Sequence, residues 1–236
     1  MAQSPARTWR EFWNRANRIY VNDRHLAAHC RVVADDILSL RPGRDAAVLD
    51  WGCGEALDAG RVAASIGRLY LYDAAPEVRG RLAQRFAAAP GIAVLDDAGL
   101  AALPERGLDL IVVNSVLQYV AKPELPGLLA QWRRWLKPGG RLVLADIVPP
   151  RDTMAADTLV LLRFARREGF LVAALFGLAA TLFSDYRRLR ARLGLSRYGE
   201  DETLALLKAA GFDAKRRVPN FGINPQRMTF VATPGP

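Results

Sequence analysis

The chain has 236 residues, of which 51% are hydrophobic, so it can bury one substantial core, as a single domain with additions. No basic segment followed by an apolar one opens the sequence, and its two cysteines, Cys30 and Cys53, provide no disulfide framework, so we expect a cytoplasmic rather than a secreted protein. The net charge of +9 permits contact with nucleic acid or anionic lipid, but arginines spread along the whole chain identify no partner.

The order of predicted elements is typical of an α/β protein with one interruption. Residues 5–40 show a loosely amphipathic helical pattern that Arg41-Pro42-Gly43 ends. From Ala47 onward, short apolar strands alternate with helices, except over residues 148–197, which form an arginine-rich, strongly apolar helical stretch. The expected strands are 47–50, 68–72, 92–95, 108–114, 141–147, 214–218 and 227–232, and the expected helices between them are 59–66, 76–88, 124–136 and 200–210.

The most informative segment is Val48-Leu49-Asp50-Trp51-Gly52-Cys53-Gly54-Glu55. It predicts a strand that ends in a tight glycine turn, where a ligand meets bare backbone. Such loops usually indicate a dinucleotide fold, but Asp50 at the mouth of the loop would repel a pyrophosphate and attract a cationic amino group. Leu57 also occupies the third glycine position of the dinucleotide spacing. The loop therefore favours a cationic ligand over NAD or FAD.

Val-Leu-Asp-x-Gly-x-Gly resembles motif I of the class I S-adenosylmethionine (SAM) methyltransferases, with Ala56 at the family's third loop glycine. Lys137-Pro-Gly-Gly and Leu206-Leu-Lys-Ala-Ala-Gly-Phe212 also resemble family segments, in the family's order. Asn114-Ser-Val-Leu-Gln-Tyr-Val120 is similar to the segment after strand four in ubiquinone/menaquinone-type small-molecule methyltransferases.

The resemblance implies a Rossmann-like fold with a mostly parallel, seven-stranded sheet and helices on both faces. It divides the chain into an N-terminal helical cap (1–45), a SAM-binding core (46–147), a helical insertion (148–198) that serves as acceptor lid or interface, and a C-terminal completion of the sheet (199–236).

Ligands of such sheets bind at the carboxyl ends of the strands. The resemblance assigns Asp73 to both ribose hydroxyls of SAM and Asp97 to the adenine amino group. The residue patterns alone leave other roles open: Asp73 or Asn114 can cap the following helix, Asp97 can belong to an ordinary turn, and Trp51 can pack against the sheet. The candidate cofactor residues are Asp50, Trp51, Gly52, Gly54, Asp73, Ala74, Asp97, Ala98, Asn114 and Ser115.

Methyl transfer from a sulfonium is an in-line displacement that alignment alone can accelerate, although a hydroxyl or phenol acceptor gains from a general base. The two histidines, His25 and His29, share one predicted helix face, but no third metal ligand lies nearby, so we expect no metal. They can also simply pack or cap. His25 is the candidate base, because N-terminal helices cover the cofactor in this family. Tyr119 is the second catalytic candidate, and it and Tyr20 can equally be lid or core aromatics.

Phe170–Phe183 carries no charge and is shorter than the ~20 residues that span a bilayer. It can be a helix packed against the core or a second subunit, as in a homodimer. Alternatively it is an apolar lid over a lipid, quinone or polyketide-like acceptor, or, with the arginines of 163–190, a peripheral membrane contact.

The sequence therefore predicts a SAM-dependent methyltransferase that acts on a small, apolar or lipid-like acceptor. An RNA methyltransferase is one alternative, although no Asn-Pro-Pro-Tyr-type motif follows strand four and no stable nucleic-acid partner is expected. A non-catalytic SAM-binding partner protein is another, and an NAD-binding protein is a fourth hypothesis.

Overall fold

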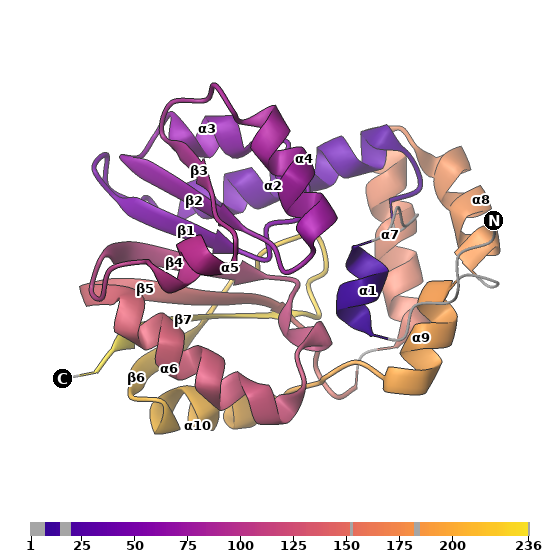
Figure 1. Cartoon of the computed structure of the whole chain (residues 1–236). Coiled ribbons are helices and arrows are strands. Elements are labelled where there is room, and N and C mark those ends of the chain that lie inside the picture. Colours follow the sequence, from indigo (N-terminus) through magenta and orange to yellow (C-terminus); the bar gives the residue numbers. More distant parts are fainter. Residues whose placement is uncertain (1–7, 15–19, 152, 182–184, 236) are drawn as a thin grey trace.

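A single sheet organises the chain in the computed structural model, which describes residues 8–14, 20–151, 153–181 and 185–235 (Figure 1). Its seven strands lie in the order β3-β2-β1-β4-β5-β7-β6, as a Rossmann-like methyltransferase sheet does. Strands β1 to β5 pair in parallel, and β7 runs antiparallel to both β5 and β6. The strands are β1 (Ala47–Trp51), β2 (Arg68–Tyr72), β3 (Ile92–Val94), β4 (Leu108–Asn114), β5 (Leu136–Ile147), β6 (Phe212–Arg217) and β7 (Met228–Pro234).

Helices cover both faces of this sheet, because its central strands are apolar on both sides. One apolar cluster joins the sheet to α6 and α10 through Trp132, Trp135 and Leu207, and the other joins it to α2, α3 and α4 through Ile37, Val62 and Leu82. The helices are α1 (Trp9–Trp13), α2 (Asp23–Ser39), α3 (Ala59–Ala63), α4 (Pro76–Arg85), α5 (Asp97–Ala101), α6 (Leu125–Trp135), α7 (Met154–Glu168), α8 (Leu171–Thr181), α9 (Asp185–Leu193) and α10 (Glu200–Ala209), with 3-10 turns η1 (Leu117–Tyr119) and η2 (Lys122–Glu124).

Strand β5 differs from its sequence prediction. It begins at Leu136 rather than at Arg141, since Leu136 pairs with Leu108 and Arg141 with Leu110. The intervening Lys137–Gly140 segment, predicted as a turn that ends the helix, forms an irregularity within the strand. Gly139 adopts a positive φ of 76° there, which explains why a glycine pair occurs inside a strand. Helix α3 is also shorter than predicted, and α5 was not predicted.

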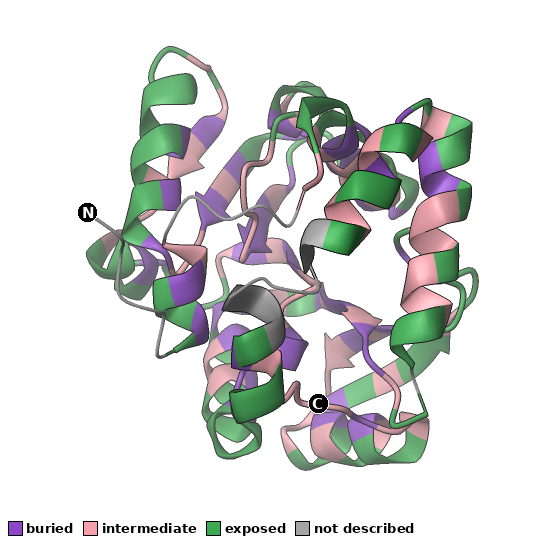
Figure 2. Ribbon diagram, turned by 90° about the vertical axis from the view of Figure 1, so that its right-hand side faces the viewer, coloured by how far each residue is buried: buried purple, intermediate pink, exposed green. Residues whose placement is uncertain are grey.

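Helices α1, α7, α8 and α9 lie together beside the sheet, on the side where α1 approaches the end of β4 (Figure 1). Trp9 and Phe12 of α1 pack with Leu189 of α9 and Tyr119, and Phe164 and Phe170 join α7 and α8 to α2. Figure 2 looks onto this side and shows helices that combine exposed and buried residues.

Helix α8 contains most of the uncharged segment 170–183, of which residues 182 and 183 lie outside the described residues. Ala174 is buried, whereas Val172, Leu175 and Phe176 are exposed. Within the described residues, no helix has the length and apolar character needed to cross a membrane. Helix α8 is thus only partly packed against its neighbours, and its outer side presents apolar side chains.

Candidate active site

Strand β1 delivers Asp50 to one face of the sheet, because successive side chains of a strand point to opposite sides. Leu49 and Trp51 belong to the cluster under α6, while Val48 belongs to the cluster under α2 and Asp50 faces that same side. Asp50 is 6% exposed, and within the described part of the chain no hydrogen bond or ion pair reaches its carboxylate. Burial, with a contribution from the charge of Asp73, raises the pKa of Asp50 to about 7.

The loop after β1 depends on positive φ angles. Gly52 has φ 81°, and a Cβ there would lie only 2.4 Å from Cγ2 of Val116. Gly54 has φ 58°, and a Cβ there would meet nothing within 4 Å, so this part of the loop borders open space. Ala56, at the expected third glycine position, also has a positive φ of 41°. The loop therefore exposes backbone at Gly54, where a ligand can approach it.

Asp73 connects the end of β2 to this loop. Its Oδ2 accepts a hydrogen bond from the Gly54 amide at 3.1 Å, and its Oδ1 accepts one from the Ala75 amide at 2.9 Å. Burial raises the pKa of Asp73, although these two bonds act in the opposite direction. The alternative role as N-cap is wrong, because the N-cap of α4 is Ala75, and the Glu77 amide in the first turn of the helix donates to Asn14 rather than to Asp73. Each Asp73 oxygen keeps acceptor capacity for a second donor.

Arg79 links Asp73 to Asp97. It donates to the Asp73 carbonyl at 2.7 Å, and its Nη2 lies 3.5 Å from Oδ2 of Asp97. The Tyr72 hydroxyl donates to Oδ1 of Asp97 at 2.8 Å, whereas the neighbouring Asp96 caps α5 through Gly99. Asp97 and Ala98 are exposed, so Asp97 can reach a ligand bound beyond the ends of β2 and β3.

Trp51 packs in the core rather than facing the loop's open side. Its ring lies 5.7 Å from that of Tyr72 and 5.3 Å from that of Trp132 between centroids, and the residue is 9% exposed. This position is explained by the alternative that Trp51 packs against the sheet.

The ends of β4 and β5 meet at Ser115 and Asp146. Ser115 Oγ donates to Oδ2 of Asp146 at 2.7 Å, and both residues have positive φ, 58° and 56°. Next to this pair, Oδ1 of Asn114 is buried and no described group donates a hydrogen bond to it. A buried acceptor without a donor costs free energy, so a donor-bearing ligand at this point would stabilise the site.

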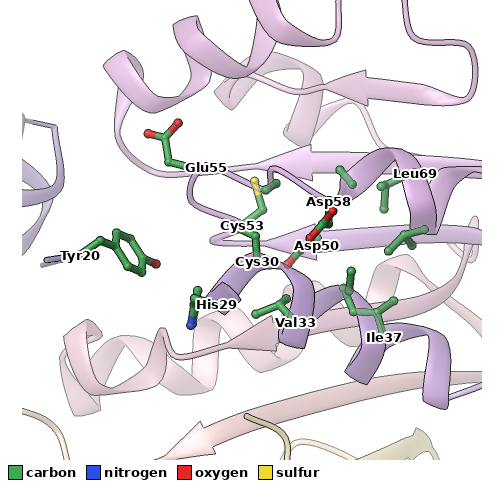
Figure 3. A pocket seen from close by; sticks show the side chains of 14 residues that line it. Tyr20, His29, Cys30, Val33, Ile37, Asp50, Cys53, Glu55, Asp58 and Leu69 are labelled. Carbon is green, nitrogen blue, oxygen red and sulfur yellow. The ribbon is translucent and has the colours of Figure 1, made fainter. Parts of the chain in front are cut away.

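A narrow cavity of about 40 Å³ separates the glycine loop from α2. Figure 3 shows His29, Cys30 and Val33 of α2 on one side, with Cys53 and Glu55 of the loop across from them. Burial and the charges of Asp50 and Asp73 raise the pKa of Cys53 well above its usual range, so this thiol stays neutral.

A second cavity, of about 190 Å³, lies where α2 and α7 face the ends of β4 and β5 and the segment 222–227. At about 15 Å³ per water molecule, it has room for roughly a dozen waters or for part of an organic molecule. One part of its wall is apolar and the rest is polar. The apolar residues are Val32, Val33, Val160, Leu161 and Ile223, and the polar ones are His29, Asn114, Ser115, Asp146, Asp157, Asn224 and Arg227.

The two histidines occupy different environments. The His25 ring stacks on Phe170 at 4.8 Å and 19°, and its Nδ1 accepts the Val21 amide at 3.3 Å, so His25 packs α2 against α8. His29 instead lines both cavities. Burial, with a contribution from the charge of His25, lowers the pKa of His29 to about 4, so its imidazole is neutral at pH 7.

Tyr119, the other catalytic candidate, packs under α1, with its ring 4.8 Å from Trp9 and 5.2 Å from Trp13. Four polar residues of the larger cavity were not predicted from the sequence: Asp146, Asp157, Asn224 and Arg227. No motif marks them, because only the fold brings β5, α7 and the segment before β7 together. Of the described residues, no group of three or more His, Cys, Asp and Glu side chains could hold a metal ion.

Part of this chain is similar in sequence to known methyltransferases. Residues 48–140 match the family described as "Methyltransferase domain". An uncharacterized methyltransferase of Mycobacterium bovis is 35% identical over 103 residues, which are 44% of this chain and 51% of that protein. The chain spans between 35% and 51% of the length of the curated relatives that it matches first.

Solved structures share the fold over nearly the whole chain. A complex between the Haloferax volcanii Trm112 methyltransferase activator and a putative methyltransferase gives a TM-score of 0.61 at 16% identity and covers 98% of this chain and 100% of that one. Magnesium protoporphyrin IX methyltransferase from Synechocystis, with bound SAH, gives a TM-score of 0.55 at 18% identity. The match covers 96% of this chain and 92% of that one. Residues 48–140 thus match a methyltransferase domain, and the chain shares its Rossmann-like fold with solved methyltransferases.

Proposed function

We propose that the chain transfers a methyl group from SAM to a small acceptor with a largely apolar body. The observation that carries this proposal is the position of Asp73, whose two carboxylate oxygens each accept one backbone amide beside the open glycine loop. This arrangement leaves one further acceptor site on each oxygen, which suits the two adjacent hydroxyls of a ribose.

The residues at the strand ends fit SAM as the cofactor. Bound SAM supplies a methyl group on a positively charged sulfur. Asp73 would hold its ribose, Asp97 its adenine amino group, and Gly52 and Gly54 would let it approach the backbone. Asp50 fits a cationic ligand because its buried carboxylate has no partner among the described residues and its pKa is raised to about 7. A nearby positive charge would favour the ionised form.

The larger cavity supports a small-molecule acceptor. Val32, Val160, Leu161 and Ile223 supply an apolar wall for the body of such a molecule. The magnesium protoporphyrin IX methyltransferase, whose fold the chain shares, is likewise named for a small molecule.

An RNA acceptor fits less well, despite the net charge of +9. Asp146 and Asp157 line the cavity against one arginine, Arg227, and two carboxylates disfavour the approach of phosphates. The chain's further contacts, with a membrane through residues 163–190 or with a second copy of itself, remain predictions of the sequence.

Isotope transfer tests the proposal. The protein is incubated with SAM that carries a tritiated methyl group and with either the small-molecule extract or the RNA of its source cells. We expect label in organic-soluble small molecules, and no label in RNA above the level of an Asp73→Ala variant. Label that enters RNA and is released by ribonuclease would contradict the proposal, as would SAM binding without transfer to either fraction.

A further inference from the structure

The larger cavity also indicates which kind of atom receives the methyl group, an inference that rests on the function proposed above. Among the residues that the structure describes, only His29 and Val33 line both this cavity and the narrow one beside the glycine loop. His29 therefore lies at the boundary between the two cavities, with Asp50 on the side of the glycine loop and Asn114 on the side of the larger cavity. A hydroxyl bound in the larger cavity can therefore approach the imidazole of His29.

His29 has an imidazole that is able to accept a proton. Tyr20 packs on its ring at 5.4 Å between centroids, and no described residue forms a hydrogen bond with its side chain. The pKa of His29 is lowered to about 4, so its imidazole is neutral at pH 7 and presents an unprotonated nitrogen. His25, one turn away, differs because Nδ1 is occupied by the Val21 amide.

The other polar groups of the cavity are largely paired with one another. Asp146 receives the Ser115 hydroxyl, and Oδ1 of Asp157 receives Asn224 at 2.9 Å and Arg227 at 2.7 Å. Oδ1 of Asn114, also in this wall, has no donor among the described residues. A molecule that fills the cavity is held best when it offers a hydrogen-bond donor to this wall and apolar surface to the opposite one.

This chemistry separates the possible nucleophiles. A carboxylate would be disfavoured, because Asp146 and Asp157 outnumber Arg227, the cation that pairs with both of them. An amine would be held by the two carboxylates as an ammonium ion, which has no lone pair for attack. A hydroxyl remains neutral on binding, and its proton becomes strongly acidic only as its oxygen bonds to carbon, so a weak base suffices to take it.

We propose that the acceptor is an alcohol or phenol with an apolar body, bound in the larger cavity, and that His29 accepts its hydroxyl proton during transfer. The hydroxyl oxygen forms a bond to the methyl carbon, and the carbon–sulfur bond breaks with its electron pair remaining on sulfur. The oxygen–hydrogen bond breaks as the proton moves to the imidazole of His29, which later releases it to solvent. The products are a methyl ether and a neutral thioether.

The test identifies the methylated atom and the role of His29 in one series. The intact protein is incubated with SAM, labelled with carbon-13 in its methyl group, and with the small-molecule extract of its source cells. Labelled products are identified by mass spectrometry and by the carbon-13 chemical shift, which distinguishes methyl groups bound to oxygen, nitrogen, carbon and sulfur. The kinetic constants are then measured with the purified acceptor for wild type, His29→Gln, His29→Ala and His25→Phe.

We expect a methyl ether, and a kcat that falls by about 10²-fold or more in both His29 variants while SAM affinity stays within about threefold of wild type. Glutamine keeps a hydrogen-bonding group, so His29→Gln should retain the wild-type KM for the acceptor but not its kcat. His25→Phe preserves the aromatic packing and should keep kcat within about threefold.

A methylamine, thioether, methyl ester or carbon-methylated product would overturn this inference and leave the proposed function standing. A methyl ether formed at wild-type kcat by the folded, SAM-binding His29→Gln variant would also overturn it. SAM binding with no labelled product would refute the proposed function and this inference together.

Discussion

Oδ2 of Asp73 accepts a 3.1 Å hydrogen bond from the amide of Gly54, and this bond joins the end of β2 to the glycine loop that follows β1. The two segments are 19 positions apart in the sequence, and parallel pairing of β1 with β2 brings them together. The carboxylate that is assigned to the ribose therefore also holds the loop that is expected to approach the cofactor. Loop geometry and cofactor recognition depend on the same side chain.

Asp50 should make the stability of the ligand-free protein depend on pH. Its pKa in the folded chain is raised to about 7, above the ordinary value of 3.8, so folding binds a proton in the range between the two. The associated stability is fully present below about pH 4 and is lost as pH rises through 7, by about 1.4 kcal/mol for each unit of pKa difference. Urea unfolding of wild type and Asp50→Asn between pH 5 and 8 measures this contribution. The free energy of unfolding of Asp50→Asn should increase relative to that of wild type as pH rises. A difference in this free energy that stays constant over this pH range would contradict the raised pKa.

Gly52→Ala should destabilise the fold. The new methyl would overlap Cγ2 of Val116 at 2.4 Å, and alanine disfavours the φ of 81°. The conformational cost is about 1–2 kcal/mol and overpacking adds about 1–3 kcal/mol, so we expect a loss of roughly 2–5 kcal/mol in chemical denaturation. Gly60→Ala in α3 is the matched control, because a Cβ there meets nothing within 4 Å, and it should be neutral or slightly stabilising. Equal effects of the two substitutions would refute the loop geometry.

Helix α8 should bind anionic lipid. Val172 and Phe176 are 68% and 75% exposed, and the preceding helix α7 carries exposed arginines at 163, 166 and 167. Apolar side chains next to basic ones favour a negatively charged membrane surface. We expect the protein to float with phosphatidylglycerol vesicles but not with phosphatidylcholine vesicles, and the double variant Val172→Ser/Phe176→Ser to remain in solution. Val218→Ser, at an exposed apolar residue outside the insertion, should float like wild type. Flotation that the double variant retains would contradict this role for α8.

Local sequence pattern predicts the central strands well, because they are continuous apolar runs. Leu108–Asn114 and Arg68–Tyr72 have the predicted bounds, and the expected seven-stranded order of elements is confirmed. The predicted start of β5 was wrong because Lys137-Pro138-Gly139-Gly140 has the composition of a turn. In the structure, Leu136 pairs with Leu108, so the strand continues across this segment. Tertiary pairing there outweighs local propensity.

The site was predictable where a motif carries it and not where the fold assembles it. Asp50, Gly52, Gly54 and Asp73 lie near one another in the chain and follow strands, so their grouping could be inferred. The sequence could not distinguish the roles of His25 and His29, because residues four positions apart share a helix face. Their environments differ only because Phe170 packs on His25. Asp157 and Arg227 are likewise 70 positions apart, and no local pattern relates them.

The most direct measurement of the central claim is a calorimetric titration of SAM into wild type, Asp73→Ala and Asp213→Asn. Asp73→Ala removes both charged acceptors offered to the ribose, each worth about 1.5–3 kcal/mol, so affinity should fall by at least about 100-fold. Asp213 is an exposed residue of β6, and its substitution should leave affinity within about twofold of wild type. Near-normal SAM affinity in a folded Asp73→Ala protein would contradict the assignment of this site to the cofactor.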